Sequence, residues 1–410
     1  MVPSVAQRSW QTPILILLCA TGVGMISLGV RFSYGVWMPQ ASRDFGWGLA
    51  ELSFAMGLQA LIWGVAAPYA GSVADRFGAG RVILFAGVTY TAGLLLMAYA
   101  STKAEAIFSI GILTGLAMGA STFPILLAII SRAVDDPRKR AVYLGIASSG
   151  GSSGQVVVLP VAHYVMVDFG WVTTLFVLAG ITALIVPMAA GLVGRGSSAR
   201  VETSDQNVGA ALREAFGHSG YLLLTAGYFV CGFQTMFIVQ HFPKLLEAYD
   251  VRPDMGAWAI SLIGLFNIAG CFFWGALGGR RRKTYLLIWL YALRSVIMTG
   301  FILLPVTNYS VAVFAALMGF LWLGTIPLTG AVVSEIFGLK FMATLFGFSF
   351  LGHQLGSFIG IWAGGWLYDV FGNYDIIWWA SIILGLVAAL LNYPIDDRPV
   401  IRASVRSADA

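Results

Sequence analysis

The chain has 410 residues, of which 58% are hydrophobic and only 10% are charged, and its formal net charge is +5. Soluble globular proteins carry about 25% charged residues, and a single soluble core stops growing at roughly 250–300 residues, so a large water-soluble core does not explain this composition. Repeated apolar segments of about 20 residues, each long enough to cross a bilayer as a helix, do explain it.

Twelve stretches are predicted to span the membrane. In chain order their limits are 13–39, 50–74, 80–100, 105–131, 141–165, 171–194, 219–243, 256–278, 283–305, 309–332, 342–367 and 374–394. Each is a near-continuous apolar run rather than a series of short alternating strands, which favours helices over a β-barrel. The predicted fold is an all-α membrane protein with twelve transmembrane helices in two pseudo-symmetric six-helix bundles.

A polar stretch after the sixth span divides the chain into two halves. The predicted organisation is an N-terminal six-helix bundle (1–194), a cytoplasmic linker (195–218), a C-terminal six-helix bundle (219–394) and a cytoplasmic tail (395–410). Within the linker, residues 208–216 could form a short interfacial helix. The tail is polar from Asp396 onward, and we expect it to be disordered.

The positive charges predict the orientation of the chain. If both chain ends are cytoplasmic, most of the 24 Lys and Arg residues fall on the cytoplasmic side, where such residues are normally enriched. The exceptions are Arg43, Lys103, Lys244 and Arg252 on the outside, and Arg31 and Arg294 within spans. We therefore expect a multi-pass protein of the bacterial inner (plasma) membrane whose basic clusters face anionic lipid and not nucleic acid. The first span is too long for a cleaved signal peptide.

A glycine–aspartate–arginine string follows the second span and recurs in degraded form half a chain later. The first copy reads Gly71-Ser72-Val73-Ala74-Asp75-Arg76-Phe77-Gly78-Ala79-Gly80-Arg81, and the second runs from Gly275 to Lys283. Together with the twelve spans, this repeat resembles the major facilitator superfamily, whose members rock two halves around a central site. The resemblance implies a conformational latch formed by Gly71, Asp75, Arg76, Gly80 and Arg81. In it the glycine permits a tight turn and Asp75 bonds the N-terminus of a neighbouring helix.

The fifth span resembles the monocarboxylate transporter branch of that superfamily, and the oxalate/formate exchangers share similar patterns. The branch has an Arg followed by Gly-x-Ala-x-x-Gly-x-x-x-Gly, represented here by Arg140, Gly145, Ala147, Gly150 and Gly154. Phe169-Gly170-Trp171 also matches at the start of the sixth span. Two positions depart from the branch: Cys271 stands where its substrate-binding arginine is expected, and Met38 where its first-span lysine is expected.

Small residues also follow one another at every fourth position of the eleventh span, as Gly352, Gly356, Gly360 and Gly364. Small residues let helix backbones approach closely. The glycine-rich fifth and eleventh spans therefore indicate either static packing or seams that slide during a change of conformation.

Two arginines lie within predicted spans, where a charge is costly and points to function. Arg31 is in the first span. In the family that the chain resembles, first spans line the central cavity. A guanidinium there could bind a carboxylate with two hydrogen bonds, or it could form a structural pair. Arg294 is in the ninth span, a peripheral position, and its bonding to neighbouring helices is the favoured interpretation. Acidic residues occur only at span ends or in loops. This combination favours an anionic over a cationic substrate.

His353, in the eleventh span, is the candidate for proton coupling, because histidine titrates near physiological pH. Tyr34, Gln155 and Asn267 are the other candidates for substrate binding, besides Arg31 and His353. Weaker candidates are Phe123, His241, Arg294, Trp322 and Gln354, together with Gln59, His163 and Gln234. Each polar residue could equally join two helices.

No cofactor or metal is expected. Cys19, Cys231 and Cys271 lie within spans and indicate neither a disulfide framework nor a metal site. The sequence has no glycine loop ending in Gly-Lys-Ser or Gly-Lys-Thr that would cradle phosphate, and no nucleophile and base at chemical spacing, so an enzyme or an ATP-driven pump is not predicted.

The leading hypothesis is a monomeric secondary carrier of a small organic anion, similar to a monocarboxylate, that works by alternating access with proton symport or anion exchange. The alternative is an efflux carrier for neutral or amphipathic small molecules. A membrane receptor is a third interpretation, disfavoured because no soluble output domain is present in the sequence.

Overall fold

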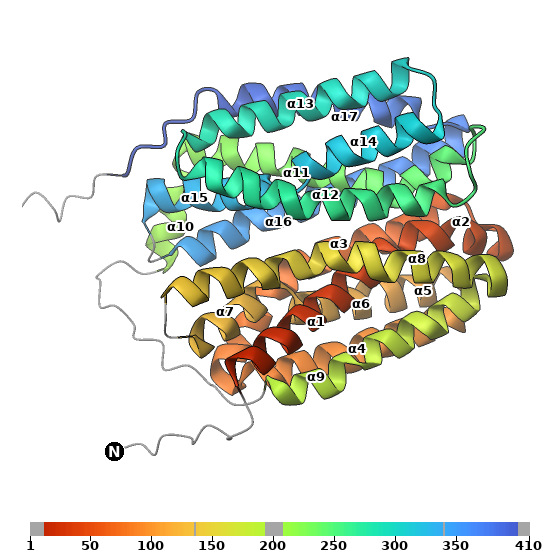
Figure 1. Cartoon of the computed structure of the whole chain (residues 1–410), viewed down its shortest axis with the longest axis horizontal. Helices are drawn as coiled ribbons and strands as arrows, with labels where there is room; N and C mark the ends of the chain where they lie inside the picture. The colour runs from red at the N-terminus through yellow and green to blue at the C-terminus, as the bar shows by residue number, and fades with distance from the viewer. Residues whose placement is uncertain (1–11, 135–136, 193–207, 339–340, 401–410) are drawn as a thin grey trace, which may run out of the picture.

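The computed structural model describes residues 12–134, 137–192, 208–338 and 341–400 (Figure 1). Every regular element in these ranges is a helix. Ten stretches of the described chain are long and apolar enough to cross a membrane. One of them, Ser149–Gly191, has 43 residues and accounts for two crossings, because Gly170 adopts a φ of 81° and separates two helices there. With α16 (Met342–Phe371) of 30 residues, the predicted twelve crossings are accounted for.

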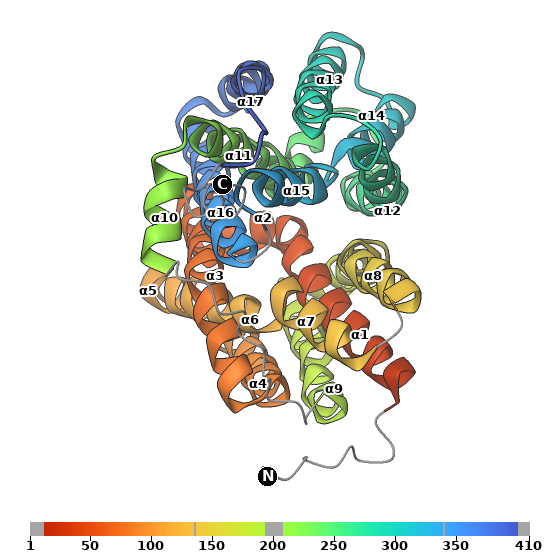
Figure 2. The same cartoon turned by 90° about the vertical axis from the view of Figure 1, so that its left-hand side faces the viewer.

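The helices fall into two groups. The first group comprises α1 (Pro13–Phe32), α2 (Tyr34–Phe45), α3 (Leu49–Phe77), α4 (Ala79–Ala98), α5 (Lys103–Ala106), the π-helix η1 (Ile107–Leu113), α6 (Thr114–Ser121), α7 (Phe123–Ala133), α8 (Pro137–Ala183) and α9 (Ile185–Gly191). The second comprises α10 (Val208–Phe216), α11 (Ser219–Leu246), α12 (Met255–Gly278), α13 (Lys283–Leu303), α14 (Asn308–Leu321), α15 (Thr325–Phe337), α16 and α17 (Asp375–Asn392). In Figures 1 and 2 most of the first group lies below the second. We call them the N-half and the C-half.

Four predicted spans are interrupted. The first breaks at Ser33, whose hydroxyl donates to the Val30 carbonyl at 2.7 Å, between α1 and α2. The fourth breaks at Thr122, which is extended with a ψ of −176° just before Pro124 in the first turn of α7. The sixth breaks at Leu184, between α8 and α9. The tenth breaks between α14 and α15. Interrupted helices expose backbone groups inside the membrane, where they are satisfied by side chains or line a site.

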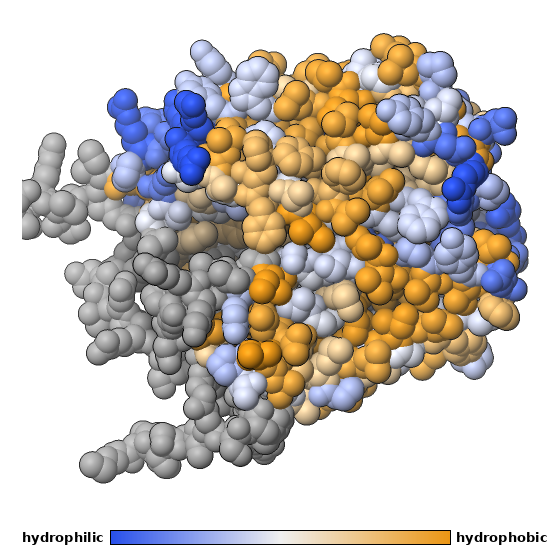
Figure 3. All heavy atoms as spheres, viewed as in Figure 1, coloured by the Kyte–Doolittle hydropathy of each residue, from blue (hydrophilic) through white to orange (hydrophobic). Residues whose placement is uncertain are grey.

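The surface has a broad apolar belt between two hydrophilic ends (Figure 3). Large apolar side chains stand exposed on it, for example Leu265, Val296 and Ile383, each at least half exposed. Such an exposed apolar band is unfavourable in water and is typical of contact with lipid.

The two glycine-rich helices pack inside their own halves. A side chain at Gly150 would lie 2.8 Å from the Thr21 carbonyl oxygen of α1, and Gly154 lies against Met25 and Gly29 of the same helix. In the C-half, a side chain at Gly360 would lie 2.5 Å from the Phe233 carbonyl oxygen of α11. Both seams therefore join helices of one half, which fits static packing.

The two halves meet most extensively along three helix pairs: α3 with α16, α8 with α12, and α2 with α11. Contact is close at the end of the molecule away from the chain termini (Figure 1). A side chain at Gly35 of α2 would lie 2.6 Å from the Gln240 carbonyl oxygen of α11. The Asp369 carboxylate of α16 accepts from the backbone N–H groups of Leu49 and Ala50, at 2.9 and 2.7 Å, at the start of α3. We call this the closed end.

The turn of the predicted latch is not at the expected glycine. Gly71 lies inside α3, which continues to Phe77, and the chain turns at Gly78 with a φ of 94°. The expectation of a turn at Gly71 is wrong because α3 extends beyond its apolar run. Arg76 and Arg81 are exposed and have no ion-pair partner among the described side chains, Gly80 is buried in the first turn of α4, and the Asp75 side chain lies outside the described residues.

The first part of the C-terminal tail is ordered, against our expectation. Ile395 is buried, and the Val400 backbone N–H donates to the Ile336 carbonyl at 2.9 Å. Arg282 donates from Nε to Asp397 at 2.9 Å and from Nη2 to the Ile395 carbonyl at 2.9 Å. Polar composition alone missed this anchoring, because the partner residues come from distant parts of the chain.

Candidate functional site

Arg31 lies in the last turn of α1, two residues before the break at Ser33. Its side chain is only 4% exposed. Nη1 donates to Gln59 Oε1 of α3, and Nη2 donates to Met236 Sδ of α11 at 3.3 Å. The guanidinium lies over the Trp63 ring, 5.5 Å from its centroid. Arg31 is therefore buried where the two halves meet, in contact with both.

Among the described residues, no carboxylate lies within ion-pair distance of Arg31. Its Nε is buried and has no hydrogen-bond partner in this part of the chain. Removing a charge from water costs several kcal/mol unless a counter-charge or a full set of hydrogen bonds compensates. The positive charge of Arg31 is thus only partly compensated by the protein.

A polar network in the N-half fixes the position of Arg31. Gln59 Nε2 donates to Thr114 Oγ1 at 2.6 Å and to the Tyr34 hydroxyl at 3.2 Å, which orients the Gln59 carbonyl oxygen toward the guanidinium. Thr114 in turn donates to the Ile110 carbonyl of η1 at 2.5 Å. Tyr34 is fully buried beside this network. A π-helical turn next to such a network is frequently found at functional sites.

Arg294 is bonded very differently, although it too is fully buried. Its Nε and Nη2 donate to the Leu321 carbonyl at 3.1 and 2.7 Å, Nη2 also donates to the Trp322 carbonyl, and Nη1 donates to Cys231 Sγ at 3.3 Å. These carbonyls end α14, where the helix dipole is negative. Arg294 therefore caps the interrupted tenth span, with every nitrogen engaged.

Asn267 and Gln155 lie on the second contact between the halves, where α8 meets α12. Asn267 Nδ2 donates to Ser152 Oγ at 2.7 Å, and its Oδ1 accepts from the Leu323 backbone N–H at 2.9 Å in the break of the tenth span. Gln155 is buried and its Nε2 has no partner among the described residues. Asn267 is thus committed to joining helices, while Gln155 retains a free donor.

His353 is buried in α16 beside two aromatic rings. Its ring centroid lies 4.7 Å from that of Tyr228 and 5.8 Å from that of Phe350, on which it stacks. Nδ1 lies 3.1 Å from Gln354 Oε1, and Nε2 has no partner within the described chain. Phe350 also meets Trp63 edge-on at 5.3 Å. Trp63 and Phe350 therefore connect the Arg31 cluster of the N-half with His353 of the C-half.

The weaker candidates are dispersed. His241 Nε2 lies 2.8 Å from the Ile361 carbonyl oxygen and Nδ1 lies 3.2 Å from the Tyr374 hydroxyl, all within the C-half near the closed end. Trp322 Nε1 and Gln354 Nε2 are buried without a described partner. The side chain of Phe123 lies outside the described residues.

Sequence reasoning missed Trp63, Met236 and Phe350. Trp63 lies one helical turn after Gln59, so the face they share could have indicated it. Met236 and Phe350 are apolar residues in apolar spans, and nothing in their local pattern sets them apart.

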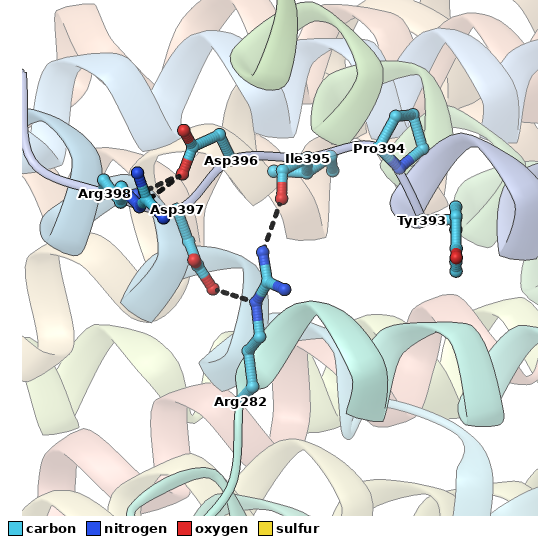
Figure 4. Close-up of a pocket in the computed structure, with 7 residues that line it drawn as sticks. All are labelled: Arg282, Tyr393, Pro394, Ile395, Asp396, Asp397 and Arg398. Atoms are coloured by element: carbon cyan, nitrogen blue, oxygen red, sulfur yellow. Dashed lines mark hydrogen bonds and ion pairs between the residues drawn. The ribbon is translucent and has the colours of Figure 1, made fainter.

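The structure offers no metal site near these residues in the parts it describes. No group of three His, Cys, Asp or Glu side chains capable of holding a metal ion occurs among the described residues. A polar surface pocket lies around Arg282, Asp397 and the residues after α17 (Figure 4). The hydrogen bond that Arg282 donates to the Asp397 carboxylate raises the pKa of Arg282. This pocket is the tail anchor described above and lies apart from Arg31.

Comparison with a sequence model of the Major Facilitator Superfamily gives matches to residues 20–338 and 224–408. Among solved structures, a bacterial homologue of the human lysosomal transporter Spinster, in an inward-facing and unoccupied conformation, is similar with a TM-score of 0.73, 14% identity and coverage of 94% of this chain and 97% of that one. A D-xylose-proton symporter is similar with a TM-score of 0.72 and 16% identity, covering 94% and 99% of the two chains.

Three curated relatives are similar in sequence over most of their length. The MFS-type transporter YhjX of Escherichia coli (strain K12) is 23% identical, over 87% of this chain and 88% of the relative. Monocarboxylate transporter 13 of Bos taurus is 24% identical, over 88% and 84% of the two chains. Multidrug resistance protein MdtH of Aeromonas hydrophila is 27% identical, over 88% and 90%.

Proposed function

The chain belongs to the Major Facilitator Superfamily, and from this premise we propose that it is a secondary active carrier of a small organic anion of the monocarboxylate type. Members of this fold move substrates by exposing one central site alternately to the two sides of the membrane. We place the carrier in the bacterial inner membrane with both termini cytoplasmic. The energy would come from proton symport or anion exchange.

The observation that carries the proposal is the buried guanidinium of Arg31, which has no carboxylate partner among the described residues. An anion bound there gains a charge-assisted, two-pronged interaction, whereas a cation is repelled at short range. The similarity to monocarboxylate transporter 13 supports the same substrate class.

The remaining residues have distinct proposed roles. Arg31 holds the carboxylate, Tyr34 and Gln59 keep the guanidinium in place, and Gln155 contributes its free Nε2 donor as the halves approach each other. Asn267 holds the broken tenth span against α8, so its contribution to orientation is indirect. With cytoplasmic termini, the closed end faces the outside, and the rocking of the halves opens it.

His353 is the proposed proton-coupling group. It is a histidine next to the contact between the halves, and one of its ring nitrogens has no acceptor or donor among the described residues. A change in its exposure as the halves move would load or release a proton. Replacement of His353 by Gln should therefore remove the dependence of uptake on the proton gradient and leave exchange of anions measurable.

Uptake in proteoliposomes tests the proposal. Purified protein is reconstituted and assayed with labelled lactate, pyruvate, oxalate and an aromatic acid, with and without an inward proton gradient. Arg31→Gln should reduce uptake of the transported acid at least tenfold, since a charged hydrogen-bond pair is worth about 1.5–3 kcal/mol. Arg43→Gln removes an exposed arginine from α2 and serves as the matched control. Undiminished uptake by Arg31→Gln would reject the assigned site.

Efflux of neutral or amphipathic compounds is the second candidate. The similarity to MdtH and the aromatic residues Trp63 and Phe350 between the two polar clusters favour it. Drug-sensitivity profiling of a deletion strain separates the two functions. Broad sensitisation supports efflux, while loss of growth on a single organic acid supports uptake of that acid.

A further inference from the structure

One of the two Arg31 nitrogens that could bind a carboxylate together donates to a methionine. In an arginine side chain, Nε–H and one Nη2–H point in the same direction and can give two parallel bonds to one carboxylate. On Arg31, Nη1 is engaged by Gln59, Nε has no partner among the described residues, and Nη2 donates to Met236 Sδ at 3.3 Å. A thioether is a weak acceptor. Of the two nitrogens that form this edge, one therefore has no described partner and the other donates to a weak acceptor.

Met236 belongs to the other half of the molecule. It lies on α11 and is 7% exposed. One helical turn further along the same helix, Gln240 Nε2 donates to Met38 Sδ at 3.4 Å and to Met56 Sδ at 2.9 Å in the N-half. Thus three weak hydrogen bonds to sulfur join α11 to the N-half near the closed end: the two from Gln240 and the one between Arg31 and Met236.

We propose that the Met236 thioether and the substrate carboxylate compete for the same Nε–Nη2 edge of Arg31. The inference rests on the proposed function and extends it. In this proposal a carboxylate that takes both donors displaces the Met236 sulfur from Nη2, which breaks the hydrogen bond between α1 and α11. Binding of substrate then weakens the contact between the halves near the closed end, which couples occupancy to opening.

Two substitutions at one position test the competition. Met236→Leu keeps the volume and removes the acceptor, so carboxylate should bind about 3- to 10-fold more tightly, the range expected for removal of one weak competing hydrogen bond. Met236→Gln supplies a stronger acceptor, the amide oxygen, and should weaken carboxylate binding by a similar factor. A purely structural role of Met236 would change binding in the same direction in both variants.

The measurement is the dissociation constant of the full-length purified protein for pyruvate, lactate and benzoate, obtained by titration in detergent. Met318→Leu, a fully buried methionine of α14, is the control and should leave the constant unchanged. Opposite shifts in the two Met236 variants support the inference. If the wild type binds these acids and the two variants do not shift in opposite directions, the competition is rejected and the proposed function stands. If the wild type binds none of them, both fall.

Discussion

Neutralising Asp369 should open the closed end. The carboxylate of this α16 residue accepts from the first two backbone N–H groups of α3, at 2.9 Å from Leu49 and 2.7 Å from Ala50, across the contact between the halves. These N–H groups have no partner inside their own helix, and the helix dipole is positive there. The substitution Asp369→Asn keeps an acceptor for one of the two donors and removes the charge.

The magnitude follows from these two bonds. A capping side chain contributes about 0.5–2 kcal/mol, and a charge at a helix terminus about 0.3–1 kcal/mol. Loss of one bond and of the charge should therefore cost the closed end about 1–2 kcal/mol. Since 1.4 kcal/mol corresponds to a factor of ten, the ratio of closed to open molecules should fall roughly 5- to 30-fold.

Distance measurement by pulsed electron paramagnetic resonance can detect this shift. Spin labels at Phe169→Cys and Tyr249→Cys report on the two halves at the closed end, where both side chains are exposed. In Asp369→Asn the population of long distances should increase. Asp375→Asn removes an exposed acid of α17 at the same end and is the matched control. An unchanged distance distribution, or an equal change in the control, would refute the role of Asp369.

Three further predictions concern stability. Arg294→Gln should lower the free energy of unfolding by about 3 kcal/mol or more, because buried carbonyls of α14 lose their donors; thermal unfolding in detergent checks this, and an unchanged midpoint contradicts it. Gly154→Leu should destabilise the N-half by at least 1–3 kcal/mol, since the backbones of Met25 and Gly29 leave no room, whereas Gly180→Ala, which faces open space, should be neutral. Asn267→Leu should cost about 1–3 kcal/mol by leaving the Leu323 N–H unsatisfied, and Asn267→Asp, which restores an acceptor, should recover part of that loss.

Hydropathy predicted the spans but could not locate their interruptions. Hydropathy is averaged over a window of residues, so it could not reveal that the helix breaks at Ser33 in the first span and at Thr122 in the fourth. The turn after the second span was placed at Gly71 instead of Gly78 for a related reason: glycine permits a turn, but only the packing of α3 determines where the helix ends.

The sequence pointed to the charged residue of the candidate site but not to its apolar residues. An arginine in an apolar span is conspicuous, because its burial is costly and needs an explanation. Met236, Trp63 and Phe350 are ordinary in an apolar chain, and only their distances to Arg31 and His353 give them a role. Gln59 was predicted only as a weaker candidate, because its carbonyl is directed at Arg31 by Thr114, a residue from a different helix.

The two buried arginines show that the hydrogen-bond acceptors around a charged side chain indicate its role better than its burial does. Arg294 donates to the carbonyls of Leu321 and Trp322 at the negative end of a helix, so its charge is stabilised by the fold itself. Arg31 has an amide oxygen and a thioether as its hydrogen-bond acceptors, and a free Nε, so the proposed anion would supply the counter-charge that the described chain does not. A ligand that binds only the folded protein raises the free energy of unfolding by mass action, by about 2.7 kcal/mol when its concentration is a hundred times its dissociation constant. The unfolding temperature rises as a consequence. The stabilisation by a carboxylate should vanish in Arg31→Gln and persist in Arg43→Gln; a carboxylate that stabilises all three proteins equally would bind elsewhere.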